Sequence, residues 1–215
     1  DLDLADALVL IAKHRPIFGI VTPAFFLEHE AKLVMSAVAE SRRLGRDGEA
    51  FSVVTNKGAP PLAAGCAIAT HLADERAWLE RVVFPALDRP LPARPALKSV
   101  RNVADAVYDM TEGGPEAPAA VLLDRASLEF FREDPQVWPK LEVRGSTEVL
   151  PADLVVVFAD GGRAERLWGV LAKMLEDENG RRICKNLQTE GFAKVESARL
   201  EAARKRFREN GDGSK

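Results

Sequence analysis

Polar residues stand directly after short apolar runs at several points of this 215-residue chain, where each run passes into a helical pattern. A helix that begins there leaves its first backbone N–H groups without helical partners, and the helix dipole adds partial positive charge. Such helix starts bind small anions, for example phosphate or a carboxylate. The polar residues concerned are Thr22, Thr70, His71, Arg101, Asn102 and Asp124.

Thr22 shows this pattern most fully. Residues 17–21 form an apolar run of strand length, which predicts a buried strand. Thr22 then stands at the N-cap position and Pro23 at the first helical position, where its missing N–H costs nothing. Two interpretations stay open for Thr22, a ligand contact or a plain helix cap. Phe26 follows at helical spacing and belongs either to the core or to the wall of a ligand pocket.

The later helix starts carry other chemistry. Thr70 and His71 end an apolar run, and a histidine can donate, accept or, when protonated, attract an anion. Arg101 beside Asn102 has the geometry for a bidentate contact to a phosphate or carboxylate. Each has a simpler alternative: Thr70 and His71 as a capping pair at the surface, and Arg101 as a solvated side chain. Asp124 is predicted first as the N-cap of the helix that follows it.

Composition and motifs exclude several function classes. Lysine and arginine number 30 against 33 aspartate and glutamate, and the signs are mixed along the chain, so nothing favours nucleic-acid binding. The apolar share of 47% predicts a packed core, but no apolar run approaches the roughly 20 residues that span a bilayer. The sequence has no P-loop, no nucleophile elbow and no metal-ligand spacing. We therefore expect no cofactor and no metal.

Catalysis is not expected either. An enzyme needs a nucleophile or a general base with an orienting partner. His71 and Asp74 are close in sequence, but no companion nucleophile accompanies them. The two cysteines, Cys66 and Cys184, are far apart; buried free thiols are one interpretation and a disulfide is the other.

The order of predicted elements indicates the architecture. Strand and helix patterns alternate, which predicts an α/β fold with mostly parallel sheets. Breaks rich in proline or glycine at 56–61 and 150–151 divide the chain. We expect one lobe from residues 1–55 and 150–215 and a second from 56–149, joined by a hinge of two chain crossings. The predicted strands are 17–21, 33–39, 51–55, 66–70, 97–100, 119–123, 141–147 and 154–158.

Several of these segments, in this order, resemble the phosphate, phosphite and phosphonate substrate-binding proteins of ABC transporters, which have the type II periplasmic binding fold. The resemblance covers roughly residues 1–205. The matching segments are 18–26, 51–55 followed by Lys57 and Gly58, Ala69 with Thr70, 103–124 and 151–158. The chain departs from the pattern at Phe26, where the family has tyrosine, and at His71, where a hydroxyl-rich turn is usual. It also departs at residues 100–102, which replace a Gly-Ser-His.

The resemblance implies a non-catalytic protein that binds a small oxyanion in a cleft between two lobes. It further implies an ABC-transporter permease as partner and a periplasmic or extracytoplasmic location, although the given chain begins without a signal peptide. Asp124 would then stand where a family aspartate meets a ligand amine. Family members begin with a strand, a helix and a strand that have no counterpart here, so we expect a first lobe that is incomplete at its N-terminus. The alternatives are an interaction subunit that keeps the fold without the ligand, and an enzyme on the same fold.

Overall fold

The computed structural model describes residues 4–91, 95–114, 117–159 and 162–211. The chain divides into two compact units, residues 1–47 with 152–195 and residues 48–151 with 196–215, which we describe one at a time. It therefore passes from one unit to the other three times, after residues 47, 151 and 195, where two crossings were expected.

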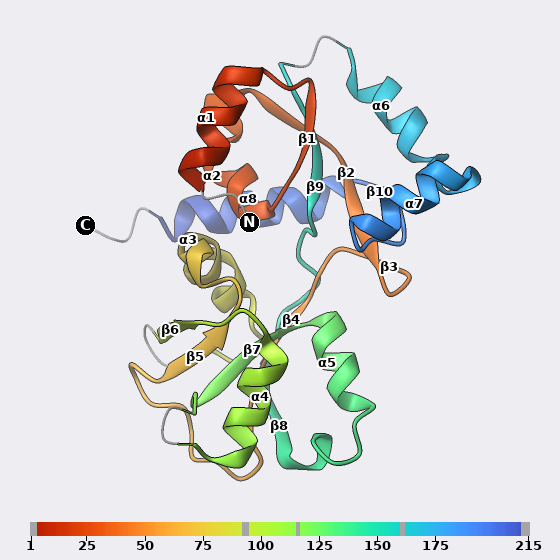
Figure 1. The fold of residues 1–215 in the computed structure, drawn as a ribbon. Coiled ribbons are helices and arrows are strands. Elements are labelled where there is room, and N and C mark those ends of the chain that lie inside the picture. Colours follow the sequence, from red (N-terminus) through yellow and green to blue (C-terminus); the bar gives the residue numbers. More distant parts are fainter. Residues whose placement is uncertain (1–3, 92–94, 115–116, 160–161, 212–215) are drawn as a thin grey trace. The chain divides into compact units, whose positions relative to one another are not determined.

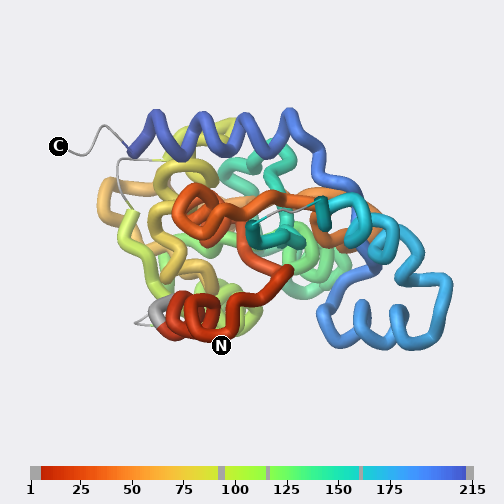
Figure 2. Tube along the Cα trace, turned by 90° about the horizontal axis from the view of Figure 1, so that it is seen from above, coloured from red at the N-terminus to blue at the C-terminus, as the bar shows by residue number. Residues whose placement is uncertain are grey.

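The unit boundaries differ from the expected 55/56 and 149/150 because of two elements. Strand β4 (Phe51–Asn56) falls in the second unit, since it pairs with β7 and β8 there. Helix α8 (Ser197–Glu209), blue in Figure 2, joins the same unit, where the Arg81 guanidinium lies 5.0 Å from the centre of the Phe207 ring. Strand β9 (Leu154–Phe158) belongs to the first unit, as expected.

The first unit has a sheet in the order β1-β9-β2-β10, with β3 paired to the end of β2. All its described pairings are antiparallel, which corrects the expected mostly parallel sheet. Strands β1 and β2 run parallel to each other, as a strand-helix-strand unit should, but β9 lies between them. Local sequence patterns do not reveal a strand inserted from more than a hundred residues away. The other strands are β1 (Phe18–Val21), β2 (Met35–Arg43), β3 (Arg46–Asp47) and β10 (Phe192–Lys194).

Strand β9 lies inside the sheet of the first unit, between β1 and β2 (Figure 1). All five of its residues are buried. Strand β1 was expected to be buried but lies at the sheet edge, where Phe18 is 57% and Ile20 45% exposed. The sequence of residues 40–49, rich in arginine, glycine and aspartate, predicts a polar loop, but β2 continues to Arg43 and forms a hairpin with β3. Leu44 and Gly45 both have positive φ at its turn, which matches the twist of paired strands. The helices of this unit are α1 (Leu4–His14), α2 (Pro23–Leu33), α6 (Ala164–Leu171), η5 (Met174–Glu176) and α7 (Glu178–Asn186).

The second unit has a mixed sheet in the order β6-β5-β7-β4-β8. Strand β5 is parallel to β6 and β7, whereas β4 is antiparallel to β7 and β8. Helices α4 and α5 cover one face, where Val107 and Phe131 pack with Ala69, Val121 and other buried residues. The strands are β5 (Ala67–Thr70), β6 (Ala96–Ser99), β7 (Ala120–Asp124) and β8 (Leu141–Ser146), and the helices are α4 (Val103–Glu112), α5 (Arg125–Arg132) and η4 (Trp138–Lys140).

The apolar residues of segment 71–83 have helical spacing, which predicts a helix, and the observed helix is irregular. It begins at Ala73 and passes without a gap through 3₁₀, α and π turns to Ala86. Trp78, Leu79, Val82 and Val83 are almost completely buried, so tertiary packing sets the path of this segment more than helical hydrogen bonding does. The pieces are η1 (Ala73–Glu75), α3 (Arg76–Trp78), η2 (Leu79–Val83) and η3 (Phe84–Ala86).

Both cysteines are free thiols, one in each unit. Cys184 is buried in α7 and Cys66 is half-buried just before β5. Burial raises the pKa of both thiols, which disfavours the reactive thiolate. Within the described ranges, no helix is long and apolar enough to span a membrane.

Candidate solute-binding site

Three parallel strands of the second unit end along one edge of its sheet. Thr70 closes β5, and its carbonyl accepts a hydrogen bond from the Val100 N–H, just beyond β6, at 3.1 Å. Strand β7 runs parallel to β5 on its other side and ends at Asp124. The carboxyl ends of these strands therefore bring together, at one edge, the predicted residues that follow them: Thr70, His71, Arg101, Asn102 and Asp124.

Asn102 caps the start of α4, as an asparagine directly before a helical run with Asp105 in its first turn predicts. Asn102 has extended backbone angles, and its side-chain oxygen accepts the Ala104 N–H at 2.9 Å. Its amide nitrogen donates to Asp105 at 3.2 Å. Arg101, the preceding residue, is exposed, and its guanidinium makes no side-chain hydrogen bond or ion pair with the described residues. The start of the ten-residue helix α4 and the adjacent Arg101 guanidinium are therefore both open to solvent.

A pocket of about 210 Å³ lies beside α4. Ala69, Ala106 and Pro118 contribute buried apolar lining, and the predicted residues Arg101 and Asn102 also line it. Three further charged residues line the pocket. They are Lys98 on β6, and Asp105 and Asp109 one turn apart on α4. The sequence interpretation missed these three, although the four-residue spacing of the aspartates on a capped helix indicates a shared face.

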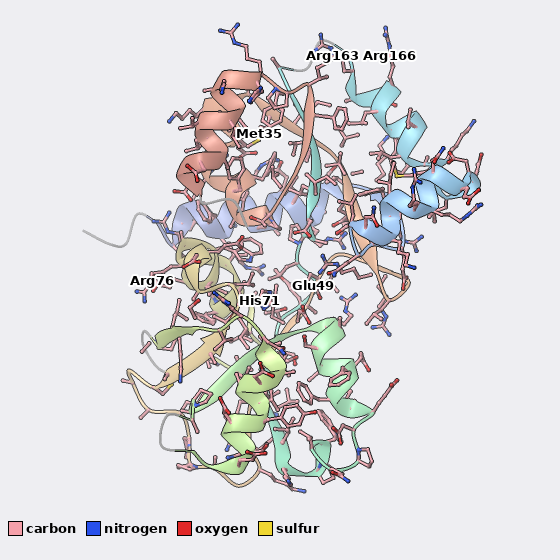
Figure 3. The ribbon with its side chains drawn as sticks, viewed as in Figure 1. Met35, Glu49, His71, Arg76, Arg163 and Arg166 are labelled. Carbon is pink, nitrogen blue, oxygen red and sulfur yellow. The ribbon has the colours of Figure 1, made fainter. Side chains whose placement is uncertain are left out.

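The start of α5 looks similar in sequence but has opposite electrostatics. Asp124 caps it, with its carboxylate accepting the Ser127 N–H at 2.7 Å. A second carboxylate, Glu49, accepts the Arg125 N–H at 3.1 Å and the Ala50 N–H at 2.9 Å (labelled in Figure 3). Burial raises the pKa of Glu49 and outweighs these hydrogen bonds, and the negative charge of Asp124 acts in the same direction. Two internal carboxylates therefore occupy the place where an external anion would bind.

The segment after β5 presents fewer groups for anion binding than its sequence suggested. Thr70 is completely buried, and its hydroxyl accepts the Leu72 N–H at 3.1 Å. His71 is exposed, and the helical piece that follows has no side-chain cap (Figure 3). Glu75 lies outside the helical region (φ -91°, ψ 40°), and the regular helical backbone begins only at Arg76, so the first N–H groups of that helix come five residues after His71.

The first unit contains the remaining two predicted residues. Thr22 caps α2 as expected, with its hydroxyl accepting the Phe25 N–H at 3.3 Å, and it is half-buried. Phe26 is 0% exposed, which favours the core alternative over the pocket wall. His29 lies one turn behind Phe25, and their rings stand edge to face at 4.8 Å. No group of three potential metal ligands occurs in the part of the chain that the structure describes.

No family model matches this chain, and no curated protein sequence matches it. Solved structures do match this chain, at low sequence identity. XAC2383 from Xanthomonas citri bound to ATP is 16% identical with a TM-score of 0.71, over 99% of this chain and 85% of that one. A binding-protein component of an ABC phosphonate transporter from Pseudomonas aeruginosa is 12% identical, with a TM-score of 0.62 over 97% and 73%. PhnD1 from Prochlorococcus marinus in complex with methylphosphonate is 11% identical, with a TM-score of 0.62 over 98% and 84%.

These likenesses show the fold. The chain has the α/β fold of type II periplasmic binding proteins, with sheets that are partly antiparallel. The predicted fold class is thereby confirmed, apart from the direction of its strands and the number of crossings.

Proposed function

We propose that this chain is a solute-binding protein that holds a small charged solute with an oxyanion group, such as a phosphate, phosphonate or carboxylate. The observation that carries the proposal is the start of α4, where exposed Arg101 and the Asn102 cap line the same pocket. Helix starts and arginine are the groups that proteins use for such anions.

The neighbouring structures support the same ligand class. XAC2383 has been solved with ATP and with chloride, and PhnD1 with methylphosphonate, all of which are anions. We extend the proposal to an ABC-type importer as the system served and to an extracytoplasmic location, following the phosphonate transporter component among these neighbours. Thr22, at the capped start of the eleven-residue helix α2, remains a proposed anion contact of the first unit by itself.

Titration calorimetry with phosphate, methylphosphonate and ATP tests the proposal. We expect at least one of these anions to bind. Arg101→Gln should weaken the affinity for that anion by about tenfold, since one charge-assisted contact is worth about 1.4 kcal/mol or more. Arg89→Gln is the matched control, because Arg89 is an exposed arginine of the same unit that does not line the pocket. Binding that both variants leave unchanged would contradict the assignment to α4.

One observation favours a second candidate function. The α5 start is filled by the carboxylates of Glu49 and Asp124, as in a fold that no longer needs an anion there. On this alternative the chain is an interaction subunit. Native mass spectrometry separates the two: a copurified small anion supports solute binding, whereas a stoichiometric protein partner without any anion supports the interaction subunit.

A further inference from the structure

We propose that two copies of this chain associate through the open edge of the first unit's sheet. Strand β1 of one copy pairs with β1 of the other, and the two α1 helices pack over the seam between them. The basis is a strand with free main-chain groups, an apolar helix without buried side chains, and charges on that helix that match those of its symmetry mate. This interface is independent of the solute site proposed above.

Strand β1 has one paired side and one open side. Within the residues that the structure describes, it pairs with β9 and with no other strand. The Phe158 N–H donates to the Ile17 carbonyl at 3.0 Å, and hydrogen-bonded pairs alternate along an antiparallel ladder, so Gly19 is the next residue that bonds to β9. The N–H and C=O groups of Phe18 and Ile20 therefore point to the open side, where a further strand can bond to them.

The open edge lacks the features that normally prevent strand pairing. Residues 17–22 contain no charged residue and no proline, and the side chains of Phe18 and Ile20 are exposed. Edge strands of monomeric proteins are usually protected by charged side chains, by proline or by a bulge. An uncharged edge also creates no repulsion between two copies of the same strand.

Helix α1 is apolar on all sides over residues 7–12. A helix of this kind is normally buried, yet none of residues 6–14 is buried and Val9 is 64% exposed. Helices α1 and α2 lie on one side of the sheet and α6 on the other (Figures 1 and 2). Because α2 packs against β2 and β9, α1 lies beyond them, toward the open edge of β1.

One twofold axis provides a partner for both elements. An axis perpendicular to the sheet at Gly19 pairs β1 antiparallel with its copy, so that Phe18 of each copy faces Ile20 of the other. Each of these pairs can exchange two hydrogen bonds, and the aromatic and β-branched side chains meet on one face. The same axis reverses the direction of α1, which brings Asp6 of one copy toward Lys13 of the other.

The charges of α1 favour a second copy over a lipid surface. Asp6 lies in the first turn of the helix, whereas Lys13 and His14 lie in the last turn. An anionic membrane would attract the basic end and repel Asp6. An antiparallel copy of the same helix instead places opposite charges together at both ends.

Sedimentation velocity of the full chain, over a wide range of protein concentration, tests the proposal. We expect a species with the mass of two chains to appear as the concentration rises. Ile20→Lys should weaken this dimer by at least about tenfold, because it places a charge on the seam. Leu187→Lys is the matched control and should leave the dissociation constant unchanged. Leu187 is 42% exposed, against 45% for Ile20, and lies in the same unit at the end of α7.

Further variants test the geometry of the interface. Ile20→Pro removes the N–H that faces the open side and no hydrogen bond to β9, so it should weaken the dimer while circular dichroism shows a folded chain. Asp6→Lys should also weaken the dimer, because it places like charges opposite each other, and adding Lys13→Glu should restore it. A structural role of either residue within one chain would not produce this rescue.

Each part of the proposal has an outcome that overturns it. A single-chain mass at every concentration would overturn the dimer, as would a different protein bound at this edge in place of the second copy. A dimer that survives both Ile20→Lys and Ile20→Pro would overturn the assignment to β1. A dimer that Asp6→Lys weakens and Lys13→Glu does not restore would overturn the antiparallel packing of α1.

Discussion

The starts of α4 and α5 are built alike but have opposite electrostatics. Both follow a strand of the same sheet, and both are capped by a side-chain oxygen, from Asn102 and from Asp124. The first has an unpaired Arg101 and an open pocket, and the second has a half-buried Glu49 against its N–H groups. A capped helix start is thus not sufficient to make an anion-binding site. What the rest of the chain places against its N–H groups decides whether an anion can bind.

Gly48 directly precedes Glu49 and allows the Glu49 carboxylate to reach α5. Substitution of Gly48 should have the largest effect of the changes predicted here. Gly48 has φ +74°, and a Cβ there would lie 2.6 Å from a Val149 methyl group and 2.7 Å from the Leu150 carbonyl oxygen. Gly48→Ala should therefore lower the free energy of unfolding by about 2–3 kcal/mol and displace Glu49 from α5. Urea denaturation measures the loss. Gly45→Ala is the control, because Gly45 also has positive φ but no atom within 4 Å of its Cβ position.

Removing each cap in turn tests whether the two starts differ in function as well as charge. Asp124→Ala and Asn102→Ala should each cost about 0.5–2 kcal/mol in urea denaturation, since each leaves a helix N–H without its partner. Only Asn102→Ala should also weaken anion binding in calorimetry. Equal losses of binding in the two variants would erase the distinction between α4 and α5.

Glu49 should make the stability of the chain depend on pH. Its pKa in the folded state is raised above the model-peptide value of 4.5, so the folded chain binds the proton more readily than the unfolded chain. Its contribution is then most favourable below about pH 4.5 and is lost as the pH rises through the folded-state pKa. Glu49→Gln should therefore be more stable than the wild type at pH 7, because the amide carries no charge to bury. The difference should shrink at pH 4, and an equal difference at both pH values would contradict this origin.

Sequence patterns predicted the local features of these sites well. The caps at Thr22, Asn102 and Asp124 were found because a cap is encoded within four residues. The same reasoning could not find Glu49, since it reaches Arg125 from 76 residues away. The antiparallel direction of β9 was missed for the same reason, because only tertiary pairing inserts it between β1 and β2. The π turn after the buried Trp78 was likewise missed, because the local periodicity predicts only a regular helix there.

Substitution of His71 should have the smallest effect of the changes predicted here, and it tests how far the comparison of helix starts extends. Its sequence position matches that of Arg101, since each follows the end of a parallel strand. However, the regular helical backbone behind it begins only at Arg76, so the first N–H groups of that helix come five residues after His71. His71→Asn should therefore change the affinity for methylphosphonate by less than about threefold at pH 7, against about tenfold for Arg101→Gln. Calorimetry of the two variants side by side measures the ratio. If His71→Asn costs as much as Arg101→Gln, then the five-residue separation between His71 and that helix start does not limit anion binding, and the carboxyl end of β5 belongs to the site.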